Sequence, residues 1–96
     1  MTFGKRGGGG RRKEPRHAAN LPAMCMTVSQ TSPADLVDVS SWGARLRCSS
    51  PPHLGEELSL SFAQIRAFGT VAWVEGSDFG VHFDAPLSAT DLRSLV

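Results

Sequence analysis

Short runs in which apolar and polar residues alternate are the feature that most constrains how this chain can fold. Residues 58–62 place two leucines and a phenylalanine around two serines, and residues 44–48 place an alanine, a leucine and a cysteine around two arginines. Successive side chains of a strand point to opposite faces, so a period of two is typical of half-buried β-strands. The chain is therefore predicted to consist mainly of strands that each contribute one face to a core.

Runs of this kind recur along most of the chain, separated by turn residues. The predicted strands cover residues 21–29, 35–39, 44–48, 58–62, 65–74 and 79–83. Pro33 and the Pro51-Pro52 pair are expected in loops, because proline cannot donate to a strand ladder. Glu75–Asp78 is expected to form a hairpin turn, and Gly69 predicts a bulge or bend in the longest run. The pattern favours an all-β fold, a small six-stranded antiparallel β-barrel that is closed or nearly closed.

The C-terminal segment has a different pattern. Ser88 and Asp91 have the spacing of a capping box, and Leu92 and Leu95 follow at helical spacing. Residues 88–96 are therefore predicted to form a short C-terminal helix. Because a helix this short is not stable alone, it is expected to dock at an open end of the barrel.

Charge is distributed unevenly between the start of the chain and the rest. Residues 1–17 hold six basic side chains and one acidic side chain, whereas residues 18–96 hold four arginines and eight acids. The glycine run at 7–10 predicts a disordered leader over residues 1–10. Residues 11–96 are predicted to form the single domain, with residues 11–16 as a flexible basic arm. This concentration of charge indicates a localised anionic partner, because a general nucleic-acid-binding protein more often spreads basic residues over its folded face.

Several classes of protein are disfavoured by length and composition. A domain within 96 residues is too small for a deep catalytic cleft. The chain has no apolar run long enough for a transmembrane helix and no apolar region of a secretory signal, so a cytoplasmic protein is expected. Cys25 and Cys48 lie in apolar runs without metal-binding spacing and are expected to be buried, reduced thiols. The histidines are likewise expected to be surface or strand residues, and no metal site is predicted.

Two short polar motifs stand out against this background. Arg12 and Arg16 form an RxxxR pattern, and Asp38, Ser40 and Gly43 form a DxSxxG pattern between two apolar runs. Each motif alone is common, since basic hexamers are usually solvated and such turns usually reverse the chain. Both motifs in this order, on a strand-rich chain of this length, are far more specific.

In these residues the chain resembles the PilZ domain family, a family of small bacterial receptors for the second messenger cyclic di-GMP. The late segments Gly69–Trp73 and Gly80–Phe83 also resemble that family, so the similarity covers roughly residues 11–85. The resemblance implies a six-stranded antiparallel barrel whose RxxxR arm orders over the ligand. This expectation agrees with the strand pattern.

The resemblance also implies which residues contact the ligand. Arg12, Arg16, Asp38 and Ser40 are assigned to ligand contact and Gly43 to the shape of the site. A guanidinium group can bond phosphate oxygens or guanine O6 and N7, and can stack on a purine. A carboxylate can accept hydrogen bonds from guanine N1–H and its amino group. The two arginines of the motif span ~13 Å on an extended segment, so each can reach a different part of the ligand.

Three further residues lie in or beside these segments. Arg11 directly precedes the motif, a position that in the family is associated with two stacked ligand molecules, so one or two molecules of cyclic di-GMP per protomer both remain open. Trp73 resembles a tryptophan that lines the pocket in some relatives, although a tryptophan in an apolar strand is more often core. Trp42 is expected to pack over a barrel end.

The predicted function is a non-catalytic receptor and effector that binds cyclic di-GMP, with ordering of the arm as the signal to a downstream protein partner of unknown identity. No cofactor is expected, and Ser40 has no motif-placed histidine that could activate it as a nucleophile. Two alternatives are a small-barrel nucleic-acid-binding protein and a degenerate PilZ-like module for protein contacts. Nucleic acid is disfavoured because the folded part is acidic.

Overall fold

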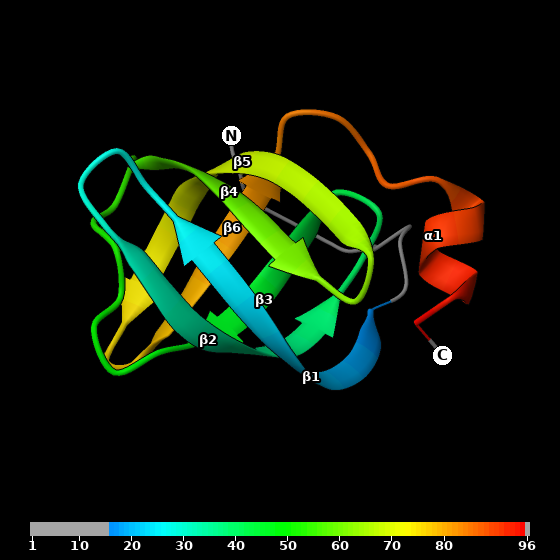
Figure 1. The fold of residues 1–96 in the computed structure, drawn as a ribbon, viewed down its shortest axis with the longest axis horizontal. Helices are drawn as coiled ribbons and strands as arrows, with labels where there is room; N and C mark the ends of the chain where they lie inside the picture. Colours follow the sequence, from blue (N-terminus) through cyan, green and yellow to red (C-terminus); the bar gives the residue numbers. More distant parts are fainter. Residues whose placement is uncertain (1–15, 96) are drawn as a thin grey trace, which may run out of the picture.

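Six β-strands and one short helix make up the fold of the computed structural model, which describes residues 16–95 (Figure 1). The strands are β1 (His17–Met26), β2 (Thr31–Val39), β3 (Gly43–Arg47), β4 (Glu57–Phe62), β5 (Ile65–Glu75) and β6 (Asp78–Phe83), and the helix is α1 (Ala89–Arg93). The predicted leader at 1–10 and all of the arm except Arg16 lie outside the described residues.

The strands close into an antiparallel barrel in the order β1-β2-β3-β6-β5-β4. Closure depends on β1, which pairs with β2 on one side and with β4 on the other. Each strand is therefore paired on both sides over part of its length, which limits the edges that could recruit another strand. The prediction of a six-stranded antiparallel barrel is confirmed.

The core fills the barrel interior with the inward residues of each alternating run. The largest fully buried side chains are Phe62, Phe79, Phe83, Leu36, Leu46, Leu60, Val39 and Val71. Burying a leucine or phenylalanine of this kind contributes roughly 1.5–3 kcal/mol, so these inward positions hold the barrel together. Cys25 and Cys48 are buried and free, and burial raises the pKa of the Cys25 thiol to about 11. In β1 the cysteine faces inward, whereas Met24 and Met26 are exposed.

The start of β2 differs from the sequence prediction. Residues 30–34 were expected to close the preceding strand, but β2 begins at Thr31 and contains Pro33, which lies opposite Met24 of β1. The prediction was wrong because this part of β2 has a neighbour on one side only. Its pairing with β3 begins at Asp35, so Pro33 lies where a missing N–H removes no bond to β3.

The start of β1 also differs, because the strand extends back to His17 rather than beginning near Leu21. His17 and Ala18 pair with Val39 and Asp38, and the register then shifts by one residue before Leu21. Asn20 lies within this bulge at a φ of 54°, in the left-handed region that asparagine tolerates better than most residues.

The bend expected at Gly69 lies three residues later. Gly69 keeps its register with Phe83, whereas the register of β5 against β6 shifts at Ala72, between Val71 and Trp73. Gly69 is instead a position of close approach, because an added Cβ would collide with the His82 carbonyl of β6 and lie 2.8 Å from Val81 Cγ1. The glycine therefore allows β5 and β6 to pack closely, and the bulge is formed at Ala72.

The predicted hairpin and helix are both present. Gly76 has a φ of 63° in the two-residue turn between Glu75 and Asp78. The Asp91 amide donates to the Ser88 hydroxyl at 3.0 Å, so Ser88 is the N-cap of α1, which ends at Arg93. Figure 1 shows α1 beside one end of the barrel, and its own residues are not buried. Among residues 16–95, no helix has the length and apolar content needed to cross a membrane.

A small ion-pair cluster fastens β3 to β6 on the outer surface. Asp78 accepts from Arg47 Nε at 2.7 Å through Oδ1 and from Arg45 Nη2 at 3.0 Å through Oδ2. The Asp78 side chain is only 18% exposed. Hydrogen bonds from Arg47 and then Arg45 lower the pKa of Asp78 from 3.8 to about 2. The charged carboxylate is therefore favoured in the folded protein.

We expect Asp78→Asn to lower the free energy of unfolding at pH 7, because the carboxylate is stabilised only in the folded state. This stabilisation is fully present above pH 3.8 and is lost as the pH falls through about 2. Urea unfolding at pH 7, 4 and 2 should thus give a difference from wild type that shrinks toward zero at pH 2. Glu75→Gln, at the exposed partner position of the same hairpin, is the control. A difference that is independent of pH would contradict this account.

Candidate functional site

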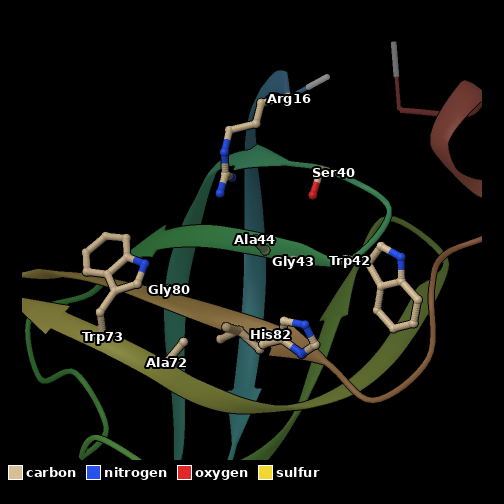
Figure 2. Close-up of a pocket in the computed structure, with 10 residues that line it drawn as sticks. Arg16, Ser40, Trp42, Gly43, Ala44, Ala72, Trp73, Gly80 and His82 are labelled. Carbon is tan, nitrogen blue, oxygen red and sulfur yellow. The ribbon is translucent and has the colours of Figure 1, made fainter. Parts of the chain in front are cut away.

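A hollow of about 240 Å³ lies on the outer surface of the barrel, over β3, β5 and β6 near the start of β1 (Figure 2). It is lined by Arg16, Ser40, Trp42, Gly43, Ala44, Ala72, Trp73, Gly80, Val81 and His82. Four of these residues, Arg16, Ser40, Gly43 and Trp73, are among those singled out in the sequence. Arg16, the one residue of the first motif that the structure describes, therefore lies beside the second motif.

Strand register explains why Arg16 reaches the second motif. His17 lies opposite Val39 and Ala18 opposite Asp38, so the residue before β1 is carried to the β2–β3 turn. Arg16 Nη1 donates to Asp38 Oδ1 at 2.7 Å, with the arginine side chain 53% and the aspartate side chain 20% exposed. An exposed ion pair contributes only about 0–1 kcal/mol to stability, so its main effect is to orient the guanidinium group.

A bulge in β2 turns Asp38 outward. Leu36 lies opposite Leu46 and Asp38 opposite Arg45, which leaves Val37 as an extra residue. A one-residue shift moves later side chains to the other face of the sheet. Leu36 and Val39 are therefore both in the core, and the carboxylate between them faces out toward Arg16.

The turn that carries Ser40 is held by several backbone hydrogen bonds. The Ser40 amide donates to the Gly43 carbonyl, the Phe83 amide to the Trp42 carbonyl and the Leu87 amide to the Ser41 carbonyl, each at 2.8 Å. Ser40 is the only buried polar residue among those described, at 7% exposure. In Figure 2 its hydroxyl oxygen points into the same space as the Arg16 guanidinium. The turn therefore presents its polar groups in a fixed arrangement.

Gly43 is required by the neighbouring strand. A Cβ at this position would lie 2.7 Å from the Val81 carbonyl oxygen of β6, closer than real Cβ atoms come to other atoms. The φ of Gly43 is not in the left-handed region, since the glycines with positive φ are Gly55 and Gly76. The close contact of β3 with β6 therefore leaves no room for a side chain at Gly43.

Trp73 lies outside the core because of the bulge in β5. Val71 is buried opposite Val81, and the extra residue Ala72 then places Trp73 opposite the outward position Gly80. The indole lies directly over Gly80, where an added Cβ would collide with its ring atoms. Trp73 is 38% exposed and forms one side of the hollow. The general expectation that a strand tryptophan is core does not hold here.

Sequence reasoning missed the other aromatic group of the hollow. Trp42 stacks on His82 with ring centroids 5.7 Å apart and an interplanar angle of 21°. Trp42 is 41% exposed and lines the hollow, a role that the expectation of packing over a barrel end did not include. The available signal was the alternation of β6, which buries Phe83 and turns His82 outward. The alternation could not predict that Gly43 pairs with His82, the pairing that brings Trp42 beside His82.

The remaining predicted contacts, Arg11 and Arg12, lie outside the described residues. Within residues 16–95, no group of three or more metal-ligating side chains is placed to hold a metal ion. The hollow thus offers a guanidinium group, a hydroxyl and flat aromatic surfaces, and the Asp38 carboxylate is not among its lining residues but pairs with Arg16. This combination suits an anionic ligand with planar rings.

Comparisons with known proteins agree with the fold. A family model described as the PilZ domain matches residues 10–96 of the chain. Among solved structures, the chain is similar to the Bacillus subtilis inhibitor of motility (MotI/DgrA), with a TM-score of 0.71 and 17% sequence identity over 90% of this chain. The chain spans 48% of the length of that protein, and at this identity the likeness shows the fold alone. A search of curated proteins gave no match.

The contact at Gly43 can be tested by one added methyl group. We expect Gly43→Ala to lower the free energy of unfolding by about 1–3 kcal/mol, because the methyl group forces β3 away from the Val81 carbonyl. Urea denaturation measures this change. Gly43→Ser, which adds a larger side chain at the same position, should be at least as destabilising. Wild-type stability in both variants would show that β3 and β6 are not in close contact here.

Proposed function

This chain belongs to the PilZ domain family, and from that premise we propose that it is a non-catalytic receptor for cyclic di-GMP. The observation that carries the proposal is the meeting of Arg16, Asp38 and Ser40 beside one hollow, although they come from two distant motifs. Under this proposal, Arg11, Arg12, Arg16, Asp38, Ser40 and Trp73 contact the ligand and Gly43 shapes the site. The ligand itself is the only small molecule that this function requires.

The chemistry of the pair Arg16 and Asp38 supports this ligand. A guanidinium group has five N–H donors, and the ion pair with Asp38 uses one of them. The others can bond phosphate oxygens or guanine O6 and N7, which are acceptors with fork geometry. Asp38 accepts the Arg16 hydrogen bond through Oδ1, which leaves its second carboxylate oxygen to accept from the guanine N1–H edge. Adenine does not present the same edge, so this pair favours guanine.

The size of the hollow supports a role for the arm. Its 240 Å³ is below the roughly 300–1,000 Å³ of sites that enclose a drug-sized ligand. A cyclic dinucleotide would fill the hollow and protrude from it. Arg11 and Arg12 precede Arg16 by only a few residues, so the arm can cover the protruding part and place further cations on the phosphates. Arm ordering is then the structural change that binding produces.

The output of this receptor is proposed to be a protein contact. Ordering the arm changes the surface near the barrel rim, and a downstream protein partner can read that change. Because cyclic di-GMP is a bacterial intracellular messenger, the proposed location is the bacterial cytoplasm. We also propose that Arg11 can supply the additional positive charge that two dianions need. In that case a second ligand molecule stacks on the first.

Calorimetric titration of the wild-type chain with cyclic di-GMP tests this proposal. We expect saturable binding, and we expect Arg16→Ala to weaken it about 10- to 100-fold, the loss typical of charge-assisted hydrogen bonds. Arg16→Lys should restore only part of the affinity, because lysine cannot form the bidentate contact. Arg66→Ala removes another exposed arginine, which lies near the start of β5 and does not line the hollow, and is the matched control.

Equal binding by Arg16→Ala and wild type would remove the first motif from the mechanism. The titration is repeated with cyclic di-AMP and with a single-stranded oligonucleotide. A nucleic-acid-binding barrel would bind the oligonucleotide with a steep dependence on salt, whereas the proposed receptor should bind neither control. The fitted number of sites distinguishes one bound molecule from two.

A further inference from the structure

Trp42 and His82 stack on each other beside the hollow, a contact that neither sequence motif accounts for. We propose that this pair is a second stacking platform, which binds a purine base of the ligand at the end of the hollow opposite Trp73. The inference rests on the proposed function and extends it. It assigns ligand contact to two residues of this chain and explains how one site could hold both bases of a cyclic dinucleotide.

The position of the pair is the first argument. Figure 2 shows Trp73 on one side of the hollow and Trp42 with His82 on the other, with Arg16 and Ser40 above the space between them. Gly80, which lies under Trp73, and His82 are two residues apart on the outer face of β6. Their Cα atoms are therefore about 7 Å apart. The Trp73 indole, over Gly80, and the Trp42 ring, against His82, thus lie at neighbouring outward positions of β6.

The rigidity of the pair is the second argument. The Trp42 carbonyl accepts the Phe83 amide at 2.8 Å, next to the residue that Trp42 stacks on. Gly43, directly after Trp42, is in register with His82 and has no room for a side chain against Val81. The backbone on both sides of the stack is fixed by the barrel. A preformed platform loses little conformational entropy when a base binds.

The exposure of the pair is the third argument. Trp42 is 41% exposed at a turn, and His82 is an exposed residue of β6. Both rings also line the hollow that contains Arg16. Exposed tryptophan is enriched at binding sites, because it supplies a large, rigid surface at little entropic cost. Purines stack well on such rings, and the imidazole nitrogens of His82 can in addition bond to phosphate or a base edge.

The chain contains only two tryptophans, so fluorescence can observe each platform separately. In Trp73→Phe, the remaining emission comes from Trp42. We expect saturating cyclic di-GMP to quench this emission, with a midpoint that matches calorimetry on the same variant. Unchanged emission from Trp42 while calorimetry reports binding would overturn the platform.

Affinity gives an independent readout. Trp42→Ala and His82→Ala should each weaken binding of cyclic di-GMP about 5- to 100-fold, the range expected for loss of one base stack. Trp42→Phe and His82→Phe keep a flat ring and should retain most of the affinity. Phe68→Ala removes an exposed aromatic ring outside this hollow and should bind as wild type does. Thermal unfolding of every variant confirms that the titrated protein is folded.

The outcomes separate this inference from the function on which it rests. If the wild-type chain does not bind cyclic di-GMP, both proposals fail. If the wild type binds and Arg16→Ala is impaired, but Trp42→Ala and His82→Ala both bind normally, the receptor stands and the platform is overturned. If the alanine variants are impaired and the phenylalanine variants are not, stacking at this end of the hollow is supported.

Discussion

Three one-residue shifts in strand register govern where the polar and aromatic groups of this barrel lie. The bulge before Leu21 lets the start of β1 pair beside the β2–β3 turn, so that Arg16 reaches Asp38. The bulge at Val37 turns Asp38 outward, and the bulge at Ala72 does the same for Trp73. Each shift changes which face of the sheet the following residues occupy, without opening the barrel. The inward residues thereby form the core, and several outward residues lie together at one site.

The fold was predictable because its main determinant is local. Buried and less buried residues alternate clearly in β3 and β4, β6 buries Phe79, Val81 and Phe83, and the Gly76 turn has a residue that accepts a positive φ. Such patterns arise from backbone geometry and need no knowledge of distant contacts. The start of β2 was mispredicted, since Pro33 is tolerated only because β3 does not reach that part of the strand. That fact belongs to the tertiary structure.

The site was predictable only in part, for a related reason. Arg16, Asp38, Ser40 and Gly43 belong to motifs, so their types and spacing carried information. The outward position of Trp73 depends on a bulge that no period-two pattern contains, because a regular strand would have placed it beside Val71 in the core. Trp42 and His82 meet only because β3 pairs with β6, a pairing between residues about forty positions apart. Pairing over such a separation is not written in either local sequence.

The barrel thus places Arg16 beside the second motif at one hollow, and the central claim is that the ligand binds there. Backbone amide NMR spectra recorded during titration with cyclic di-GMP test that claim most directly. The account predicts that the amide signals of Ser40, Gly43, Gly80 and His82 shift as ligand is added. The signals of Thr27, Ser59 and Phe68, which surround a separate hollow, should stay in place. Shifts confined to the second group would contradict the account.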